Sequence, residues 1–118
     1  MPRPHKPRTV CQMPENLRYG PEDENNRKRE QIVLPIDEYE TLRLIDYEGY
    51  TQEEAAQQMQ VARTTVQRIY NDARHKVADA IVNGKKIFIA GGNYHICQPE
   101  DPGCARPCRL HHRNRGRL

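Results

Sequence analysis

Residues 51–84 constrain the fold most, because they carry two helical patterns separated by a short break. Thr51 is followed at the third position by Glu54, which is the spacing of a capping box at a helix start. Residues 60–62 interrupt the pattern, and beyond them apolar residues recur at steps of three and four until Gly84 supplies a stop. This apolar stripe consists of Val66, Ile69, Tyr70, Ala73, Val77, Ala80 and Ile81. The sequence therefore predicts a short helix, a tight turn and a second helix of about five turns.

The opposite face of the second helix is polar and cationic near its start. No carboxylate occurs there before Asp72. Arginine and glutamine can make bidentate contacts to guanine and adenine, and threonine can meet a thymine methyl group. This face predicts a helix that reads the major groove of double-stranded DNA, and the competing interpretation is an ordinary solvated face. The residues expected to contact DNA are Arg63, Thr64, Thr65, Gln67, Arg68 and Asn71.

A third helix is expected to begin at Asp37, with Glu40 as its capping-box partner, and to be closed by Gly49. The apolar runs 32–34 and 85–90 predict short strands. The second run can pair with the first or with its own copy in a homodimer. We therefore expect a mainly α fold, a three-helix helix-turn-helix domain with one or two short strands and extended basic tails.

Composition divides the chain into a basic arm and polar loop (1–30), the helical domain (31–92) and a Cys/His-containing basic tail (93–118). The first twelve residues carry +3 and residues 105–118 carry +5, so a net charge of +3 leaves −5 between them. Basic flanks suit phosphate contact. In the arm, Arg3 and Arg8 are expected to enter the minor groove of DNA, and a solubilising tail is an equal alternative.

With 36% hydrophobic residues in 118, the chain can bury a modest core, and no run approaches a membrane span. The N-terminus has no apolar core typical of a secretory signal, so we expect a cytoplasmic protein without a membrane partner.

Cysteines and histidines gather near the C-terminus, and reduced thiols in a cytoplasmic protein favour a metal over disulfides. They could surround one tetrahedral ion, with zinc as the first candidate and an iron–sulfur cluster as the second. Thiols without a ligand are an equal alternative. The candidate ligands are Cys11, Cys97, Cys104, Cys108 and His111.

Residues 30–92 resemble a small prokaryotic protein family of unassigned function with a helix-turn-helix similar to region four of sigma factors. The resemblance rests on LPIDEYETLRLIDYEGYTQEEAAQQM, VARTTVQRIYNDARHKVADAIVNGK and IAGG, and on RTVCQMP upstream. It implies sequence-specific DNA binding and transcriptional regulation. The chain departs from the family at Gln60, where glycine is usual in the turn, and at Ala62, where serine commonly caps the second helix. Gln60 is therefore expected to adopt a left-handed backbone at a cost of about 1 kcal/mol.

Three functions follow from these patterns. The first is a DNA-binding transcriptional regulator, expected to be dimeric. The second is a metal- or redox-responsive sensor that uses the cysteine tail. The third is an adaptor that contacts RNA polymerase through the helical hairpin. An enzyme is not expected, because the sequence lacks a nucleotide-binding loop, a metallohydrolase motif and a glycine-flanked nucleophile.

Overall fold

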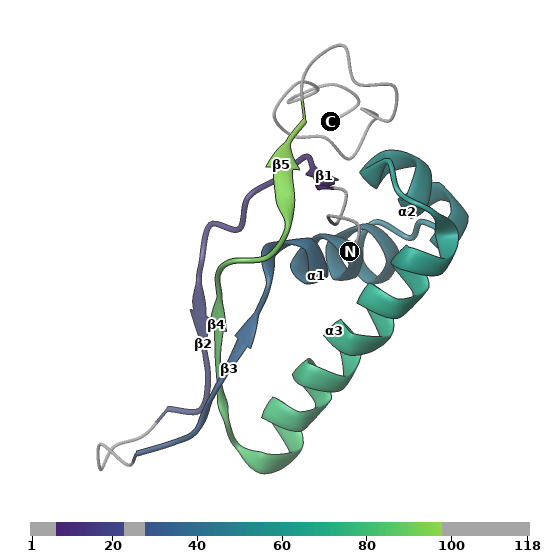
Figure 1. Ribbon diagram of the computed structural model, residues 1–118. Helices are drawn as coiled ribbons and strands as arrows, with labels where there is room; N and C mark the ends of the chain where they lie inside the picture. The colour runs from purple at the N-terminus through teal and green to yellow at the C-terminus, as the bar shows by residue number, and fades with distance from the viewer. Residues whose placement is uncertain (1–6, 23–27, 98–118) are drawn as a thin grey trace, which may run out of the picture.

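The computed structural model describes residues 7–22 and 28–97, which form short strands and a set of packed helices (Figure 1). In chain order the elements are β1 (Arg8–Val10), β2 (Arg18–Tyr19), β3 (Gln31–Leu34), α1 (Ile36–Thr41), the π-helical segment η1 (Leu42–Tyr47), α2 (Gln52–Met59), α3 (Arg63–Asn83), β4 (Lys86–Ile89) and β5 (Tyr94–Ile96). The mainly α architecture with short strands agrees with the sequence-based expectation. None of the helices in these ranges has the length and apolar character needed to cross a membrane.

The larger sheet has the order β2-β4-β3. β3 and β4 are parallel, from Gln31 opposite Lys86 to Leu34 opposite Ile89, and β2 is antiparallel to β4. In the sequence, the helices of the described residues all lie between β3 and β4. In space, α3 runs beside the sheet that these two strands form (Figure 1). Residues 85–90 could pair with residues 32–34 or with their own copy in a homodimer. In the structure, the strand in this run, β4, pairs with β3 of the same chain.

A second, two-stranded sheet joins the two ends of the described chain. β1 and β5 are parallel, with Arg8 opposite Tyr94 and Val10 opposite Ile96. The described residues thus contain five short strands, where one or two were expected. The additional strands β1 and β2 lie in the predicted arm and loop, and β5 lies in the predicted tail. Strands of two or three residues are too short to show an alternating apolar pattern.

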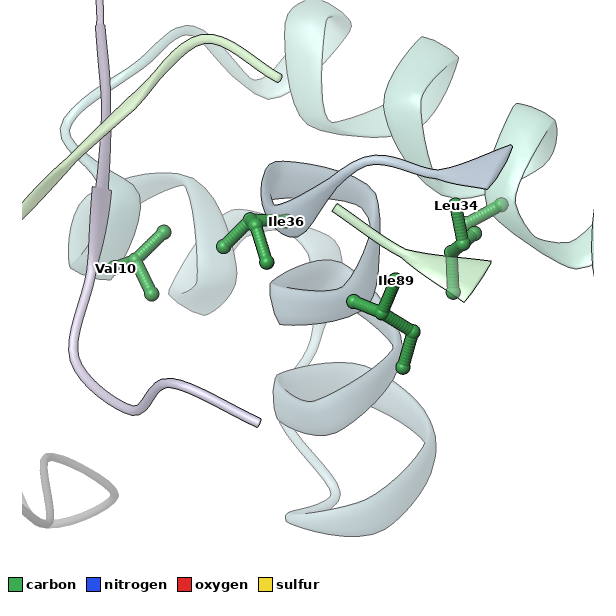
Figure 2. Close-up of a cluster of buried hydrophobic side chains, with 5 residues drawn as sticks. Val10, Leu34, Ile36 and Ile89 are labelled. Carbon is green, nitrogen blue, oxygen red and sulfur yellow. The ribbon is translucent and has the colours of Figure 1, made fainter. Parts of the chain in front are cut away.

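The first core cluster lies where the strands meet α1 and α3. Val10, Leu34, Ile36 and Ile89 come together from β1, β3, α1 and β4, with Ala73 of α3 completing the cluster (Figure 2). Each of these side chains is at most 3% exposed. Burial of a large aliphatic side chain contributes about 1.5–3 kcal/mol. This cluster therefore fixes α3 against both sheets.

The second core cluster fastens the two helices of the hairpin to η1. Leu44 of η1 packs with Ala55, Ala56 and Met59 of α2 and with Val66 of α3. The small side chains of the two alanines let α2 and α3 approach closely, because a larger residue there would separate the helices. Leu44, Met59 and Val66 are fully buried.

The capping box predicted for Asp37 and Glu40 at the start of α1 is wrong. Pro35 is the residue before the first turn, and its φ of −60° and ψ of 154° suit that position. Asp37 and Glu40 follow inside the helix and are buried. Asp37 faces Arg8 of β1, with 3.8 Å between Oδ2 and Nε. A non-local ion pair has thus replaced the local cap that sequence spacing suggested.

The last turn of α3 is buried at Ala80 and exposed at Ile81. The predicted inner stripe includes Ile81, but this residue is 75% exposed, so the prediction is wrong at this position. The helix ends at Gly84, whose φ is +65° and whose carbonyl accepts a hydrogen bond from Arg29 Nη1 at 2.8 Å. The predicted stop is therefore confirmed.

The segment after β4 passes close to the start of α1. The backbone N–H of Ile36 donates to the carbonyl of Gly91 at 2.8 Å. Gly92 has a φ of +103°, and a Cβ atom there would lie 2.7 Å from Asp37 Oδ1 and 3.0 Å from Pro35 Cβ. Both the conformation and the space require glycine at this position.

Candidate nucleic-acid interface

α2 begins with the predicted capping box and ends in the predicted left-handed turn. The backbone N–H of Glu54 donates to Thr51 Oγ1 at 3.1 Å, and the N–H of Thr51 donates to Glu54 Oε1 at 2.9 Å. Gln60, the residue after α2, has a φ of 58° and a ψ of 44°. Both features were predicted from sequence and are confirmed. They fix the angle at which the chain leaves α2.

α3 begins without a side-chain cap. Ala62 has the extended conformation typical of a capping residue, with a φ of −67° and a ψ of 150°, but its methyl group accepts no hydrogen bond. The N–H of Val66 donates to the Ala62 carbonyl at 3.1 Å, which starts the helical pattern. Ala62 therefore occupies the capping position of α3, as expected, and lacks the hydroxyl that serine would provide there.

Two polar contacts hold α3 to the helices before it. Tyr70 Oη donates to Asp46 Oδ1 at 2.7 Å, and Lys76 Nζ donates to both carboxylate oxygens of Glu38 at 2.9 Å. Burial raises the pKa of Tyr70, and the hydrogen bond to Asp46 raises it further. Burial also raises the pKa of Glu38, although Lys76 opposes the shift. These contacts fix which face of α3 points outward.

The outward face at the start of α3 contains most of the residues predicted to read DNA. Thr65 is half-buried, because it lies next to the turn. The other five form a continuous polar surface over the first two turns of the helix and are free to meet a macromolecule. The exposed residues are Arg63, Thr64, Gln67, Arg68 and Asn71.

A surface hollow of about 710 Å³ adjoins this face. Arg8 of β1, Arg63 and Arg68 are among its lining residues, together with the acidic Glu53. The side-chain Nε2 of Gln60 is buried and has no hydrogen-bond partner in the described residues. The hollow therefore offers hydrogen-bond donors to an anionic or polar ligand. Its lining consists of Arg8, Glu53, Ala56, Gln57, Gln60, Val61, Ala62, Arg63, Thr65 and Arg68.

Part of this hollow does not follow from the sequence pattern. The pattern indicates only a strained turn at Gln60 and gives no sign that Gln57 or Glu53 borders a hollow. The left-handed backbone of Gln60 was the one available signal that this side chain leaves the regular helical surface. The contribution of β1 had no sequence signal, because it depends on strand pairing with β5.

Arg8 belongs to the body of the protein and not to a free arm. Its side chain is 7% exposed and lies beside Asp37. Burial raises the pKa of Asp37, and the positive charge of Arg8 opposes that rise. Arg8 thus borders the same hollow as Arg63 from a fixed position. The other predicted arm contact, Arg3, lies outside the described residues.

Two of the five predicted metal ligands come together. Cys11 and Cys97 form a buried cluster of their own, at the ends of β1 and β5. Cys104, Cys108 and His111 lie outside the described residues. Within residues 7–22 and 28–97, no group of three or more Cys, His, Asp or Glu residues has the arrangement of a metal site.

Comparisons with known proteins place the chain in a family. A family model described as "Protein of unknown function DUF134" matches residues 1–97. A UPF0251 protein of Desulfitobacterium hafniense is 52% identical over 116 residues, which cover 98% of this chain and 93% of that protein. A UPF0251 protein of a Thermoanaerobacter species is 45% identical over 103 residues, which cover 87% of this chain and 91% of that protein. One from Chlorobaculum tepidum is 45% identical over 106 residues, which cover 89% of this chain and 54% of that protein. No solved structure matches the chain. The chain therefore belongs to the DUF134 family.

Proposed function

We propose that this protein is a sequence-specific DNA-binding transcriptional regulator that inserts the first half of α3 into the major groove. The observation that carries the proposal is the exposed face of α3 beside a tight turn. Arg63, Gln67 and Arg68 are exposed there, on a helix whose inner face is buried. The arrangement suits a helix-turn-helix motif, in which the first helix crosses the backbone and the second reads bases.

The charges around this face favour a polyanion. Three arginines and one glutamate line the hollow, which gives its lining a formal charge of +2, and Asp37 offsets the charge of Arg8 from behind the lining. Guanidinium groups bind phosphate bidentately as well as base edges. Gln60 Nε2 adds a buried donor without a partner among the described residues. Rotation of the Gln60 side chain toward the surface would let that donor reach a phosphate beside the turn while α3 lies in the groove.

The rigidity of the hairpin also supports the proposal. Base reading requires side chains that start from a fixed position, because each misplaced contact loses its hydrogen bond. The Tyr70–Asp46 and Lys76–Glu38 contacts and the packing of Val66 fix α3 at three positions along its length. The chain places no carboxylate on the first two turns of the exposed face.

The test begins with selection of preferred duplexes from a random-sequence pool by the full-length protein. Binding of the selected and a scrambled duplex is then measured by fluorescence anisotropy at two salt concentrations. Arg68→Ala should weaken binding to the selected duplex by about 1–3 kcal/mol and affect the scrambled duplex much less. Lys86→Ala is the control, because it removes an exposed cation at the other end of α3, on β4.

Several outcomes are informative. Equal losses on both duplexes would make Arg68 a phosphate contact. Failure to enrich any sequence, together with binding that ignores salt, would overturn the proposal, because phosphate contacts give a steep salt dependence. Stable binding to purified RNA polymerase without DNA binding would favour the adaptor. Two inverted half-sites in the selected sequence would indicate a homodimer.

A further inference from the structure

The two described cysteines are brought together by the β1–β5 ladder. Val10 lies opposite Ile96, and the N–H of Cys97 donates to the Val10 carbonyl at 2.9 Å. Cys11 and Cys97 thus follow the last paired residues of two parallel strands. Their exposed fractions are 0% and 1%, and they form a cluster separate from both apolar cores.

The surroundings of Cys11 differ from those of a cysteine that merely fills apolar space. Gln58 Nε2 donates to Cys11 Sγ at 2.8 Å. The backbone N–H of Cys11 donates to Glu40 Oε2 at 3.0 Å, and Glu40 in turn binds Arg43 Nε and Nη2 at 2.8 Å each. The Arg43 guanidinium also interacts electrostatically with Cys11. The charge of Arg43 is offset by Glu40, so the feature that favours a thiolate, the form that binds metals, is the Gln58 donor directed at the sulfur.

The geometry points to Cys11 and Cys97 as two ligands of a thiophilic metal ion, with Zn²⁺ as the first candidate. Thiolates are soft ligands that select zinc over hard cations such as magnesium or calcium. Binding of Zn²⁺ converts the two thiols into two thiolates and releases two protons to solvent. A tetrahedral ion then has two positions left. Cys104 and Cys108 follow Cys97 in the sequence and lie outside the described residues, so whether they fill those positions is decided by the experiment below.

Gln58 links this site to the helical hairpin. It is a residue of α2, it is 2% exposed, and its amide directs a proton at the proposed ligand sulfur. Hydrogen bonds of this kind orient metal ligands, and their loss typically weakens metal binding about ten- to a hundredfold. An occupied site would therefore hold α2 in place through Gln58. Any effect of the metal on DNA affinity rests on the function proposed above.

The first experiment identifies the ligands in the wild-type protein, which avoids variants that fail to fold. The purified full-length protein is analysed for zinc and then loaded with ¹¹³Cd²⁺, and a ¹¹³Cd–¹H correlation spectrum assigns the ligating cysteines through their Hβ protons. One equivalent of metal with correlations to Cys11 and Cys97 is expected. Further correlations to Cys104 and Cys108 would complete the ligand set. Absence of stoichiometric metal binding, correlations that omit Cys11 or Cys97, or a disulfide between these two in freshly purified protein would overturn the assignment. An iron–sulfur chromophore after anaerobic purification would replace zinc by a cluster and would equally overturn the zinc site.

The second experiment tests the role of Gln58. Gln58→Leu should bind Zn²⁺ about ten- to a hundredfold more weakly in competition with a chelator, while Gln31→Leu, at an exposed glutamine of β3 outside the hollow, should bind as the wild type does. Far-UV circular dichroism checks that both variants fold. Equal zinc affinities of the two variants would overturn the role of Gln58. DNA affinity is measured with and without zinc in parallel. If zinc binds as described and DNA binding does not respond, only the link between the sites fails. If DNA binding is absent altogether, the proposed function fails and the metal site stands.

Discussion

The uncapped start of α3 offers a substitution whose effect on stability can be worked out from the structure. Ala62 has the backbone conformation of a capping residue, but no side-chain oxygen is available to the first N–H groups of α3. In Ala62→Ser, the hydroxyl can accept a hydrogen bond from the N–H of Thr64 or Thr65 without moving the backbone. The side chain is exposed, so the added hydroxyl brings no burial cost.

The expected gain is about 1 kcal/mol, within a usual range of about 0.5–2 kcal/mol for such caps. The unfolding entropy of a chain of 118 residues is about 0.25 kcal/mol per kelvin, so the midpoint of thermal unfolding should rise by roughly 4 °C. In urea, with a slope of about 2 kcal/mol/M, the midpoint should rise by about 0.5 M at unchanged slope.

The assay is urea and thermal unfolding followed by far-UV circular dichroism. Thr51→Ala is the matched comparison, because it removes the cap that α2 already has in the same hairpin. It should lower the free energy of unfolding by about 1 kcal/mol. If Thr51→Ala lowers the urea midpoint and Ala62→Ser leaves it unchanged, the reasoning about the start of α3 is refuted.

Two further predictions concern buried carboxylates. Glu40→Ala should lower the free energy of unfolding by about 3–5 kcal/mol in urea titrations, because it leaves the buried Arg43 without its closest partner; a loss below about 1 kcal/mol would contradict this. Burial raises the pKa of Glu38 above its ordinary value of 4.5, so the folded state binds this proton more tightly than the unfolded state. The stabilising contribution of Glu38 is therefore full below pH 4.5 and is lost as the pH rises through its raised folded pKa. Lowering the pH from 7 to 5 should raise the stability of the wild type relative to Glu38→Gln, and a constant or falling difference between their urea midpoints would refute the sign.

Local features were predictable from the sequence because their causes are local. The capping box at Thr51, the left-handed Gln60 and the stop at Gly84 each depend on residues within one helical turn, and the structure has all three. The strand at residues 31–34 was predictable because β-branched and aliphatic residues adjoin a proline that ends the run.

Features that depend on distant partners were not predictable. The pattern at Asp37 matched a capping box, but Pro35 already suits the first position, and Asp37 instead meets Arg8 from a strand far away in sequence. Ile81 has the correct helical spacing, yet Ala80 takes the buried position in that turn of α3 and Ile81 points to solvent. In the candidate site, the exposed face of α3 could be predicted from the spacing of its apolar residues. The position of β1 beside the hollow could not, because it depends on the pairing of β1 with β5.

The parallel β1–β5 pair has a mechanical consequence. The chain enters β1 at one end of this ladder and leaves β5 at the other, because the two strands run in the same direction. Tension applied between residues 7 and 97 therefore loads the ladder in shear, so its hydrogen bonds share the force and must fail together. An antiparallel pair at the same place would open one bond at a time like a zipper. The ladder spans only about 10 Å, so a bridge between the thiols beyond its end would carry a large share of that load.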